Sequence, residues 1–506
     1  MLPPSHDAPA RTLGALLLLL PWLNPFAPGP TSHVVQSLLS LACLALLLLL
    51  PLWQGGGSAL VRVAAPAWLL AALLSCLIAL LQYFGASQAW SPWVNSTGLG
   101  EAFANLRQRN QFASLTTIGL AALLWWAQAV RTLAWASPAS LLAAVLLGVG
   151  NAASSSRTGL LELLLLALLL LVWQQWRSSL VWRVMLAVGV AYGSATLLLP
   201  WLAGFGFGGT GILARMQEQA PSCASRLTLW HNVLYLIAEK PWGGWGWGEL
   251  DYAHFITLYP GPRFCDILSN AHNLPLHLAV ELGLPVAALL CGGGLWALWR
   301  SQPWRETNSA RQLAWAVLAI LGLHSLLEYP LWYGPFQLAA GLALALLWLT
   351  RPSAVAVPWP GRVGTPVAVA PELWRLAIAI SLMFAVLYAA WDYHRIRQIY
   401  LPVAERAVPY RDNTLAKLQG SWLFGPQVDF AQLTTTVLSP SNASAGQALA
   451  EAMLHFSPEP RVIEQLLDSL RLQGREDALQ FYLPRFQAAF PEPYGRWVSR
   501  NGRNSR

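Results

Sequence analysis

Long apolar stretches alternate with short polar segments along the chain as far as residue 392. A stretch of about 20 residues with almost no charge is long enough for an α-helix to cross a bilayer. Such stretches lie at residues 12–29, 34–53, 66–84, 111–128, 132–150, 159–175, 182–202, 273–299, 311–327, 331–350 and 372–392. The pattern predicts an all-α polytopic membrane protein with about 11 transmembrane helices.

The first apolar stretch also has features of a secretory signal peptide. Arg11 precedes "TLGALLLLLPWLNPF", which fits the charged and apolar regions of such a peptide. A small-x-small cleavage site does not follow cleanly, so we expect this stretch to remain as the first membrane helix.

Two regions depart from the membrane pattern. Residues 203–272 form a long loop with short helical stretches, and residues 393–506 carry apolar positions at helical spacing with polar opposite faces. The tail is expected to form four to six short helices, with a possible TPR-like packing for which no repeat consensus is clear. The predicted domains are a transmembrane catalytic domain at 1–392, the large loop 203–272 within it, and a helical domain at 393–506.

The distribution of arginine predicts the topology. The net charge is +8, and much of it lies in short loops on one side of the predicted spans, for example Arg62, Arg131 and Arg300. The positive-inside rule places that side and the N-terminus in the cytoplasm. Residues 203–272 and the tail then face the periplasm of a bacterial inner membrane. Because topology explains the charge, we expect the lipid bilayer as a partner and no nucleic acid.

Ionisable and polar residues collect at the outer ends of the spans, whereas the cytoplasmic half has no comparable set. Such residues near a membrane mark functional sites by default, so we expect a site that opens to the periplasm near the outer leaflet. The set comprises Arg107, Arg109, Asn110, Gln111, Arg157, Glu162, Arg226, Lys240, His272, Asn273, His277, Glu281, His324 and Glu328.

Helical spacing gives these residues different expected roles. His277 and Glu281 are four apart, as are His324 and Glu328, so each carboxylate can hold an imidazole in one tautomer or simply shape a wall. His272 stands at a predicted helix N-terminus, where the dipole disfavours protonation. A neutral imidazole there suits a general base, although an interfacial polar residue is the alternative.

Arginines near an outer-leaflet cavity suit a diphosphate, because guanidinium binds phosphate oxygens in bidentate fashion. Arg157 and Arg226 are the candidates, with lipid-headgroup anchoring as the alternative. No Asp-rich metal motif is visible in the outer loops, so arginine is expected to take the role of a metal.

Two further features of the outer loop stay open. Cys223 and Cys265 form an even pair that can be disulfide-bonded in an oxidising compartment or remain reduced. The "GGWGWGEL" stretch after Trp242 can be a phosphate cradle or a turn at the membrane interface. No Lys-Ser/Thr follows it, which excludes a P-loop.

The stretch "HNLPLHLAVELG", from His272 to Gly283, resembles the signature of the O-antigen ligase and polymerase superfamily. That signature is His, then Asn/Ser/Gln, nine residues, and Gly-x-x-Gly; here Val286 replaces the second glycine. Further motifs resemble the bacterial protein O-oligosaccharyltransferases of the PglL type, over about residues 100–410. They are "LRQRNQFAS", "SSSRTGLLE", "EKPWGGWGWGEL", "HSLLEYPLWYGPF" and "WDYHRIRQIYLP".

The resemblance implies a glycosyltransferase of the GT-C class that needs no metal or other cofactor. It implies inverting, en bloc transfer of a glycan from undecaprenyl diphosphate to a Ser or Thr hydroxyl of an exported protein such as pilin. By this resemblance His272 matches the essential histidine and activating base, and Arg157 and Arg226 match diphosphate-binding residues, with Arg109 beside them. Polar positions expected to support the site are Gln111, Asn273, His277, Glu281, His324, Glu328 and Tyr329.

Three rivals remain at this point. An O-antigen ligase would transfer the glycan to lipid A–core, and a polymerase would extend the glycan itself. A transporter or flippase for lipid-linked sugars should place polar groups near the midplane and show inverted repeats. The polar groups here crowd one side and no repeat is visible, which favours transfer chemistry.

Overall fold

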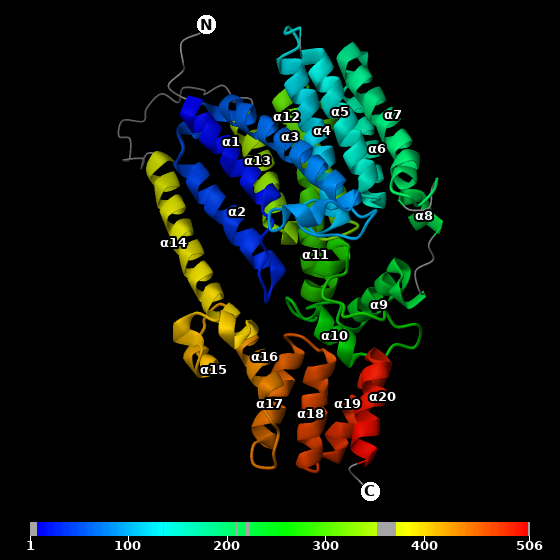
Figure 1. Ribbon diagram of the computed structural model, residues 1–506, viewed down its shortest axis with the longest axis vertical. Coiled ribbons are helices and arrows are strands. Elements are labelled where there is room, and N and C mark those ends of the chain that lie inside the picture. Colours follow the sequence, from blue (N-terminus) through cyan, green and yellow to red (C-terminus); the bar gives the residue numbers. More distant parts are fainter. Residues whose placement is uncertain (1–7, 135, 208–210, 218–221, 352–370, 504–506) are drawn as a thin grey trace. The chain divides into compact units, whose positions relative to one another are not determined.

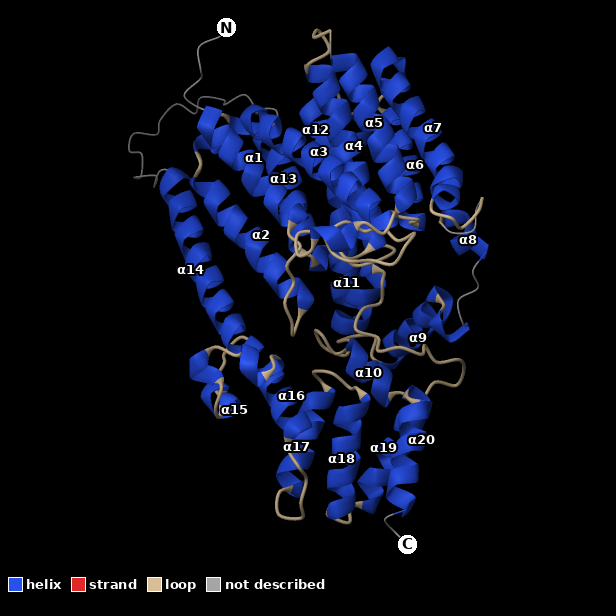
Figure 2. Ribbon diagram, in the orientation of Figure 1, coloured by secondary structure: helices blue, strands red, loops and turns tan. Residues whose placement is uncertain are grey.

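The structure of the protein, a computed structural model, describes residues 8–134, 136–207, 211–217, 222–351 and 371–503. All regular structure in these residues is helical, without a strand (Figure 2). Residues 208–210 and 218–221 of the predicted loop lie outside them. The α-helices are α1 (Ala8–Leu23), α2 (Ser32–Leu49), α3 (Gly56–Tyr83), α4 (Arg109–Ala129), α5 (Ala136–Ala153), α6 (Arg157–Val172), α7 (Ser179–Leu202), α8 (Ile212–Gln217), α9 (Arg226–Glu239), α10 (Leu250–Ile256), α11 (Leu274–Ser301), α12 (Ser309–Ser325), α13 (Gly334–Leu349), α14 (Pro371–Arg397), α15 (Thr414–Leu418), α16 (Gly425–Thr435), α17 (Ala443–Leu454), α18 (Pro460–Leu472), α19 (Glu476–Ala489) and α20 (Pro491–Arg503).

A helix occupies each of the predicted membrane stretches, and the all-helical polytopic class is confirmed. Six helices of the described chain are long and apolar enough to cross a membrane, and three shorter apolar helices accompany them. The six are Gly56–Tyr83, Arg109–Ala129, Ala136–Ala153, Ser179–Leu202, Leu274–Arg305 and Glu372–Tyr400; the shorter three are Ala8–Leu23, His33–Leu49 and Gly334–Leu349. The number of spans and their direction stay predictions.

One predicted boundary differs clearly from the structure. Helix α3 begins at Gly56, ten residues before the predicted start, and continues through Pro66. A proline usually ends or kinks a helix because it lacks an N–H and its ring clashes with the preceding turn. Membrane helices tolerate proline, since neighbouring groups satisfy the carbonyl that it leaves free.

The chain divides into two compact units. Unit 1 comprises Met1–Glu218 and Ser301–Tyr388, and unit 2 comprises Gln219–Arg300 and Ala389–Arg506. This grouping places the loop and α11 with the tail, and the division falls inside α14. The predicted domain boundaries describe membrane topology, which the structure does not test.

Unit 1 is a helical bundle with α3 and α4 at its centre (Figure 1). Helix α5 packs on α3, α4 and α7; α12 packs on α4, α6 and α13; and α13 packs on α2. The N-terminal apolar stretch is part of this bundle. Its helix α1 packs on α3 and buries Leu18 and Trp22, whose ring lies 5.0 Å from that of Phe336.

Unit 2 joins the loop helices α9 and α10 and helix α11 to the tail helices α15–α20. Helices α16–α20 stack side by side (Figure 1) around a core that also takes Phe255 from α10. Polar contacts hold α10 on the tail: Glu249 Oε2 lies 2.7 Å from His455 Nδ1, and Arg485 Nε donates to the Ile256 carbonyl at 2.7 Å. The tail therefore rests on the loop segment that leads toward His272.

Candidate functional site

The predicted site residues divide between the two units. Unit 1 holds Arg109, Gln111, Arg157, His324, Glu328 and Tyr329, and unit 2 holds Arg226, His272, Asn273, His277, Glu281 and both loop cysteines.

His272 occupies a fixed turn directly before α11. Its backbone is left-handed, with φ of 49°, a conformation that is uncommon outside glycine, and its N–H donates to Asn270 Oδ1 at 2.8 Å. On the other side, Asn273 Oδ1 accepts the N–H of Leu276 at 3.1 Å and so caps the helix. Two asparagines therefore hold the half-buried histidine at the helix N-terminus, as the sequence predicted.

Helix α9 contacts this turn within unit 2 through Trp230. The indole Nε1 of Trp230 donates to the carbonyl of Ala271, the neighbour of His272, at 3.1 Å. Arg226 begins α9, four residues before Trp230, and therefore lies on the same helix face. Ser225 caps the helix by accepting the N–H of Thr228 at 3.1 Å. The exposed arginine and the histidine thus belong to one braced region.

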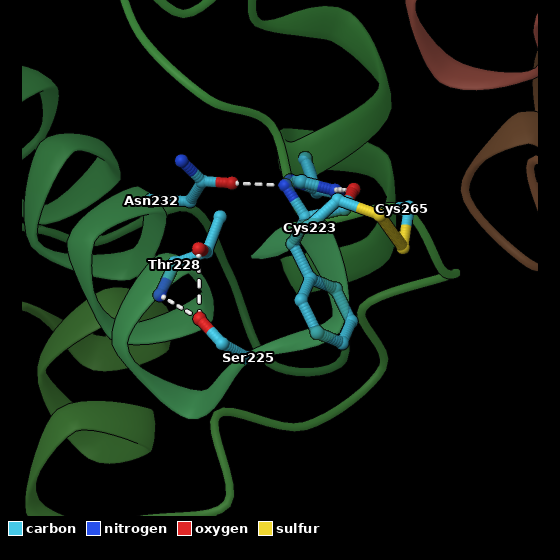
Figure 3. Close-up of a disulfide and its surroundings, with 7 residues drawn as sticks. Cys223, Ser225, Thr228, Asn232 and Cys265 are labelled. Atoms are coloured by element: carbon cyan, nitrogen blue, oxygen red, sulfur yellow. Dashed lines mark hydrogen bonds between the residues drawn. A yellow bond between two sulfur atoms is a disulfide. The ribbon is translucent and has the colours of Figure 1, made fainter. Parts of the chain in front are cut away.

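A disulfide joins Cys223 to Cys265, with the two Cα atoms 5.3 Å apart (Figure 3). Next to it, Asn232 accepts the N–H of Phe264 at 2.7 Å and donates to the carbonyl of Pro262 at 2.9 Å. These contacts tie the start of α9 to the segment that runs into His272.

Helix α11 is broken at Gly283, whose φ of 82° and ψ of 163° are not helical. The "GGWGWGEL" stretch satisfies the backbone groups that the break frees. The N–H groups of Trp245 and Gly246 donate to the carbonyls of Val280 and Glu281, each at 2.9 Å.

A bond in the other direction joins the same two segments, since the N–H of Leu284 donates to the carbonyl of Pro241 at 2.8 Å. We call these three backbone bonds around Gly283 the clamp. A Cβ on Gly283 would lie 2.6 Å from the carbonyl carbon of Trp242, so only glycine fits. The amides of Trp245 and Gly246 are engaged and cannot cradle a phosphate. The stretch therefore stabilises irregular backbone at a break in an apolar helix.

His277 and Glu281 precede the break and form the same-face pair that their spacing predicts. Nε2 of the imidazole lies 3.6 Å from Oε2 of the carboxylate, and both side chains are buried. Glu281 also belongs to the contacts at the break, because its carbonyl accepts the N–H of Gly246.

Unit 1 contains a buried polar cluster centred on Ser114, which we call the Ser114 cluster. Ser114 Oγ lies 2.5 Å from Glu162 Oε1, 2.7 Å from His324 Nδ1 and 3.1 Å from the carbonyl of Asn110. The side chains of Ser114, Glu162 and His324 are fully buried. One hydroxyl thus links helices α4, α6 and α12 within the apolar bundle.

Asn110 extends the cluster toward the helix ends. Its amide nitrogen donates to Glu328 Oε1 at 3.2 Å, and its Oδ1 accepts the hydroxyl of Ser156 at 2.7 Å. Ser156 also caps α6 by accepting the N–H of Gly159 at 3.0 Å. The cluster therefore reaches the turn from which Arg157 begins α6.

The predicted pairing of His324 with Glu328 rests on their helical spacing, and one backbone bond of this spacing joins the two residues beyond the end of α12. Helix α12 ends at Ser325, and the N–H of Glu328 bonds to the carbonyl of His324 at 2.8 Å. The carboxylate accepts from Asn110, while the imidazole lies 3.8 Å from Glu162. His324 thus also has a carboxylate neighbour on another helix, and its pairing with Glu328 stays a prediction.

The remaining predicted residues of unit 1 have contacts of their own. Arg109 forms an ion pair with Glu101, and the guanidinium of the exposed Arg157 donates to the carbonyl of Arg215. Tyr329 stacks on Tyr333 with ring centroids 6.1 Å apart, and Gln111 is buried in the first turn of α4.

Asn110 belongs to the polar set that the sequence predicts, whereas Ser114 and Ser156 were not among the predicted site residues. Their signal is visible in the sequence, because Asn110, Gln111, Ser114 and Thr117 recur at helical spacing in an otherwise apolar helix. Within the described ranges, no group of three or more His, Cys, Asp or Glu residues could hold a metal ion. Metal-independent chemistry stays a prediction.

Two titratable residues of α10, which is not one of the candidate membrane helices, have shifted pKa values. Burial lowers the pKa of His254 to about 3, and its ring bonds to the Tyr259 hydroxyl at 2.8 Å and the Phe264 carbonyl at 3.1 Å. Burial raises the pKa of Asp251 to about 7. His254 is therefore a neutral structural residue that connects α10 to Phe264, the neighbour of the disulfide-bonded Cys265.

Three segments of the chain that carry these residues match known protein families. Residues 142–291 match the family described as O-antigen ligase, and residues 102–127 match protein glycosylation ligase. Residues 312–503 match the family described as virulence factor membrane-bound polymerase, C-terminal. No solved structure matches the chain.

Two relatives come from Acinetobacter baylyi (strain ATCC 33305 / BD413 / ADP1). A general O-oligosaccharyltransferase is 25% identical over 341 residues, which are 65% of this chain and 56% of that protein. A ComP-specific O-oligosaccharyltransferase is 24% identical over 288 residues, 56% of this chain and 51% of that protein. The chain spans about half the length of these relatives. On these matches, the chain is similar to protein O-oligosaccharyltransferases, and residues 142–291 carry its similarity to O-antigen ligase.

Proposed function

We propose that the chain transfers an oligosaccharide en bloc from undecaprenyl diphosphate to Ser or Thr hydroxyls of an exported, pilin-like protein. The proposed setting is the periplasmic face of a bacterial inner membrane, with a cytoplasmic N-terminus and a periplasmic tail. The observation that carries the proposal is His272, held in a fixed turn at the start of α11 inside the segment that matches O-antigen ligase.

In the proposed reaction, the acceptor hydroxyl oxygen attacks the anomeric carbon of the glycan from the side opposite the diphosphate. The new C–O bond forms as the bond to the diphosphate breaks, so the configuration inverts. His272 takes the hydroxyl proton, and the diphosphate leaves with the bonding electron pair. Arg157 and Arg226 balance the charge of that leaving group, which is why the reaction is expected to need no metal.

The test is reconstitution of the purified protein in liposomes with a lipid-linked glycan and a pilin acceptor. His272→Asn keeps a residue that tolerates the left-handed backbone but removes the base, because asparagine is enriched at positive φ. Transfer should fall by about a hundredfold or more, the usual contribution of a general base. The matched control is His231→Ala, which changes an exposed histidine on α9.

Wild-type transfer by folded His272→Asn would exclude the assigned role of His272. For the arginines, Arg226→Ala should raise the KM for the donor, while Arg183→Ala, an exposed arginine on α7, should not. Transfer should persist in EDTA, and its loss there would contradict the assignment of charge balance to arginine.

Polymerisation is the second candidate, favoured by the match of residues 312–503 to a membrane-bound polymerase family. The same liposomes separate the options by product. Glycan on pilin supports the proposal, longer lipid-linked glycan supports the polymerase, and glycan on added lipid A–core supports the ligase. Movement of intact lipid-linked glycan across the bilayer without transfer would support a flippase.

A further inference from the structure

Helix α11 changes its surroundings abruptly at Gly283. Every residue from His272 to Gly283 is buried or half-buried, whereas all of residues 284–301 except Ala287 and Cys291 are exposed. The first part of the helix packs in a core with α9 and α10, and Ala287 is the last residue of α11 to join that core. Beyond it, the helix presents its side chains on all sides.

The two parts also differ in composition. The exposed part, "LPVAALLCGGGLWALWRS", carries a single charge, Arg300, close to its end, whereas the first part contains His277 and Glu281. A helix that is apolar all round needs an apolar environment, either a protein core or a membrane. The exposed part measures about 27 Å along its axis, close to the thickness of the hydrocarbon core of a bilayer.

Two exposed tryptophans are fixed at the level of this change. Trp242 is 79% exposed and Trp247 is 66% exposed. The residue before Trp242 accepts the N–H of Leu284, and the residue before Trp247 donates its N–H to the carbonyl of Glu281. Because Glu281 and Leu284 are less than one helical turn apart, the clamp holds both tryptophans within about 5 Å of one level along α11.

The neighbours of these tryptophans suit lipid headgroups. Lys240 is exposed, and its Nζ lies 3.9 Å from the ring centroid of Trp245. Tryptophan is enriched where headgroups meet acyl chains, and a lysine at that level is attracted to anionic lipid. Exposed tryptophans also bind glycans and proteins, but here they continue directly into the exposed apolar surface of a candidate membrane helix. That continuity favours lipid as the partner.

We infer that one surface of the bilayer lies at Gly283, with residues 284–301 as the spanning part of α11 and with Trp242 and Trp247 as its anchor among the lipid headgroups. The predicted span 273–299 then becomes shorter at its polar end. His277 and Glu281 stay outside the hydrocarbon, where ionisable groups are costly. The first part of α11 holds the turn before it about 14 Å away from that surface, measured along the helix axis.

Spin labels on single cysteines test this placement by measuring depth in liposomes of phosphatidylethanolamine and phosphatidylglycerol. Trp242→Cys and Trp247→Cys report on the anchor, and Leu289→Cys reports on the spanning part. Leu284→Cys reports on the level of the anchor while both indoles remain in place. Val437→Cys is the control, because this residue is 86% exposed and lies in the tail between α16 and α17.

The background for all labels is Cys291→Ser, which removes the half-buried free thiol of α11. Cys43 and Cys76 are buried, and the other two cysteines form the disulfide, so none of them should react with the label. Collision of each label is measured with oxygen, which concentrates in hydrocarbon, and with a nickel chelate, which stays in water.

The labels at positions 242, 247 and 284 should be at least about threefold less accessible to the nickel chelate than the label at position 437, because the bilayer excludes charged and strongly hydrated solutes. The label at position 289 should collide more often with oxygen, since it lies about 8 Å deeper along the helix. Accessibility to nickel equal to that at position 437 would place the stretch in water and overturn the inference in favour of a glycan or protein partner. Low accessibility to both reagents would show that protein covers these positions, which would overturn it as well.

Discussion

The Ser114 cluster of unit 1 and the His272 region of unit 2 are held in opposite ways. In the cluster, side chains from α4, α6 and α12 meet on one hydroxyl in a fully buried setting. Around His272, backbone amides, asparagine caps and a disulfide fix an irregular segment. The cluster should therefore respond to changes of polar side chains, and the His272 region to changes of backbone conformation and covalent bracing.

The largest expected effect is on the covalent brace. Cys223→Ser opens a disulfide that closes a loop of 42 residues in sequence separation, so unit 2 should lose about 3–5 kcal/mol of stability in the chain-entropy account. Protease sensitivity of residues 222–272 should rise, while α3–α7 stay protected. Cys291→Ser, which removes a free thiol of α11, is the control. Unchanged protection in Cys223→Ser would show that the disulfide does not hold the His272 region in place.

The clamp at the helix break is the next test. Gly283→Ala puts a Cβ on a residue whose φ and ψ are essentially reserved for glycine and pushes it into Trp242. We expect a loss of at least about 2 kcal/mol in thermal or denaturant unfolding.

Val286→Gly is the control for this change, and it restores the second glycine of the superfamily signature. Val286 is 41% exposed, so the change should cost less than about 1 kcal/mol, the helix-propensity penalty of glycine. A similar loss in both variants would mean that the break at Gly283 has no special role.

The Ser114 cluster is tested by removing its shared hydroxyl. Ser114→Ala deprives Glu162 and His324 of a hydrogen-bonding partner in a buried site, which should cost about 1–3 kcal/mol. Ser140→Ala on α5 is the control, since this equally buried serine bonds only to the carbonyl of Ala136 in its own helix. The measurement is the difference in melting temperature. Equal shifts in the two variants would show that the cluster is no more than local hydrogen bonding.

The smallest expected effect is a change in pH dependence outside the membrane helices. The pKa of Asp251 is raised to about 7, so the folded protein binds a proton more readily than the unfolded chain, and this group's contribution falls as pH rises from about 4 to 7. The pKa of His254 is lowered to about 3, so its contribution rises with pH between about 3 and 6.5. The two slopes oppose each other in the wild type.

Asp251→Asn removes the falling slope and leaves the rising one. The melting temperature of this variant should therefore increase more steeply between pH 4.5 and 6.5 than that of the wild type. Asp266→Asn is the control, because this carboxyl lies in the same loop and is exposed. Parallel curves for wild type and Asp251→Asn would contradict the assignment.

The sequence predicted features that depend on one helix and missed those that depend on how helices meet. Hydropathy located the membrane helices, and spacing four apart placed His277 beside Glu281, because both rules act within one helix. The partners of His324 were beyond reach, since they depend on where α4 and α6 pass α12. The clamp was also beyond reach, because a glycine at positive φ and a glycine inside a helix look the same in a sequence.

The disulfide has a consequence for how the protein matures. Disulfides form and persist in oxidising compartments, whereas the chain is synthesised in a reducing one. If the loop faces the periplasm, as proposed, the segment that leads into His272 gains its covalent tie to α9 only after its two cysteines have been exported. In the proposed enzyme, a newly made chain would lack this brace while its loop is still on the side of synthesis, so oxidation would be the last step in the maturation of the His272 region.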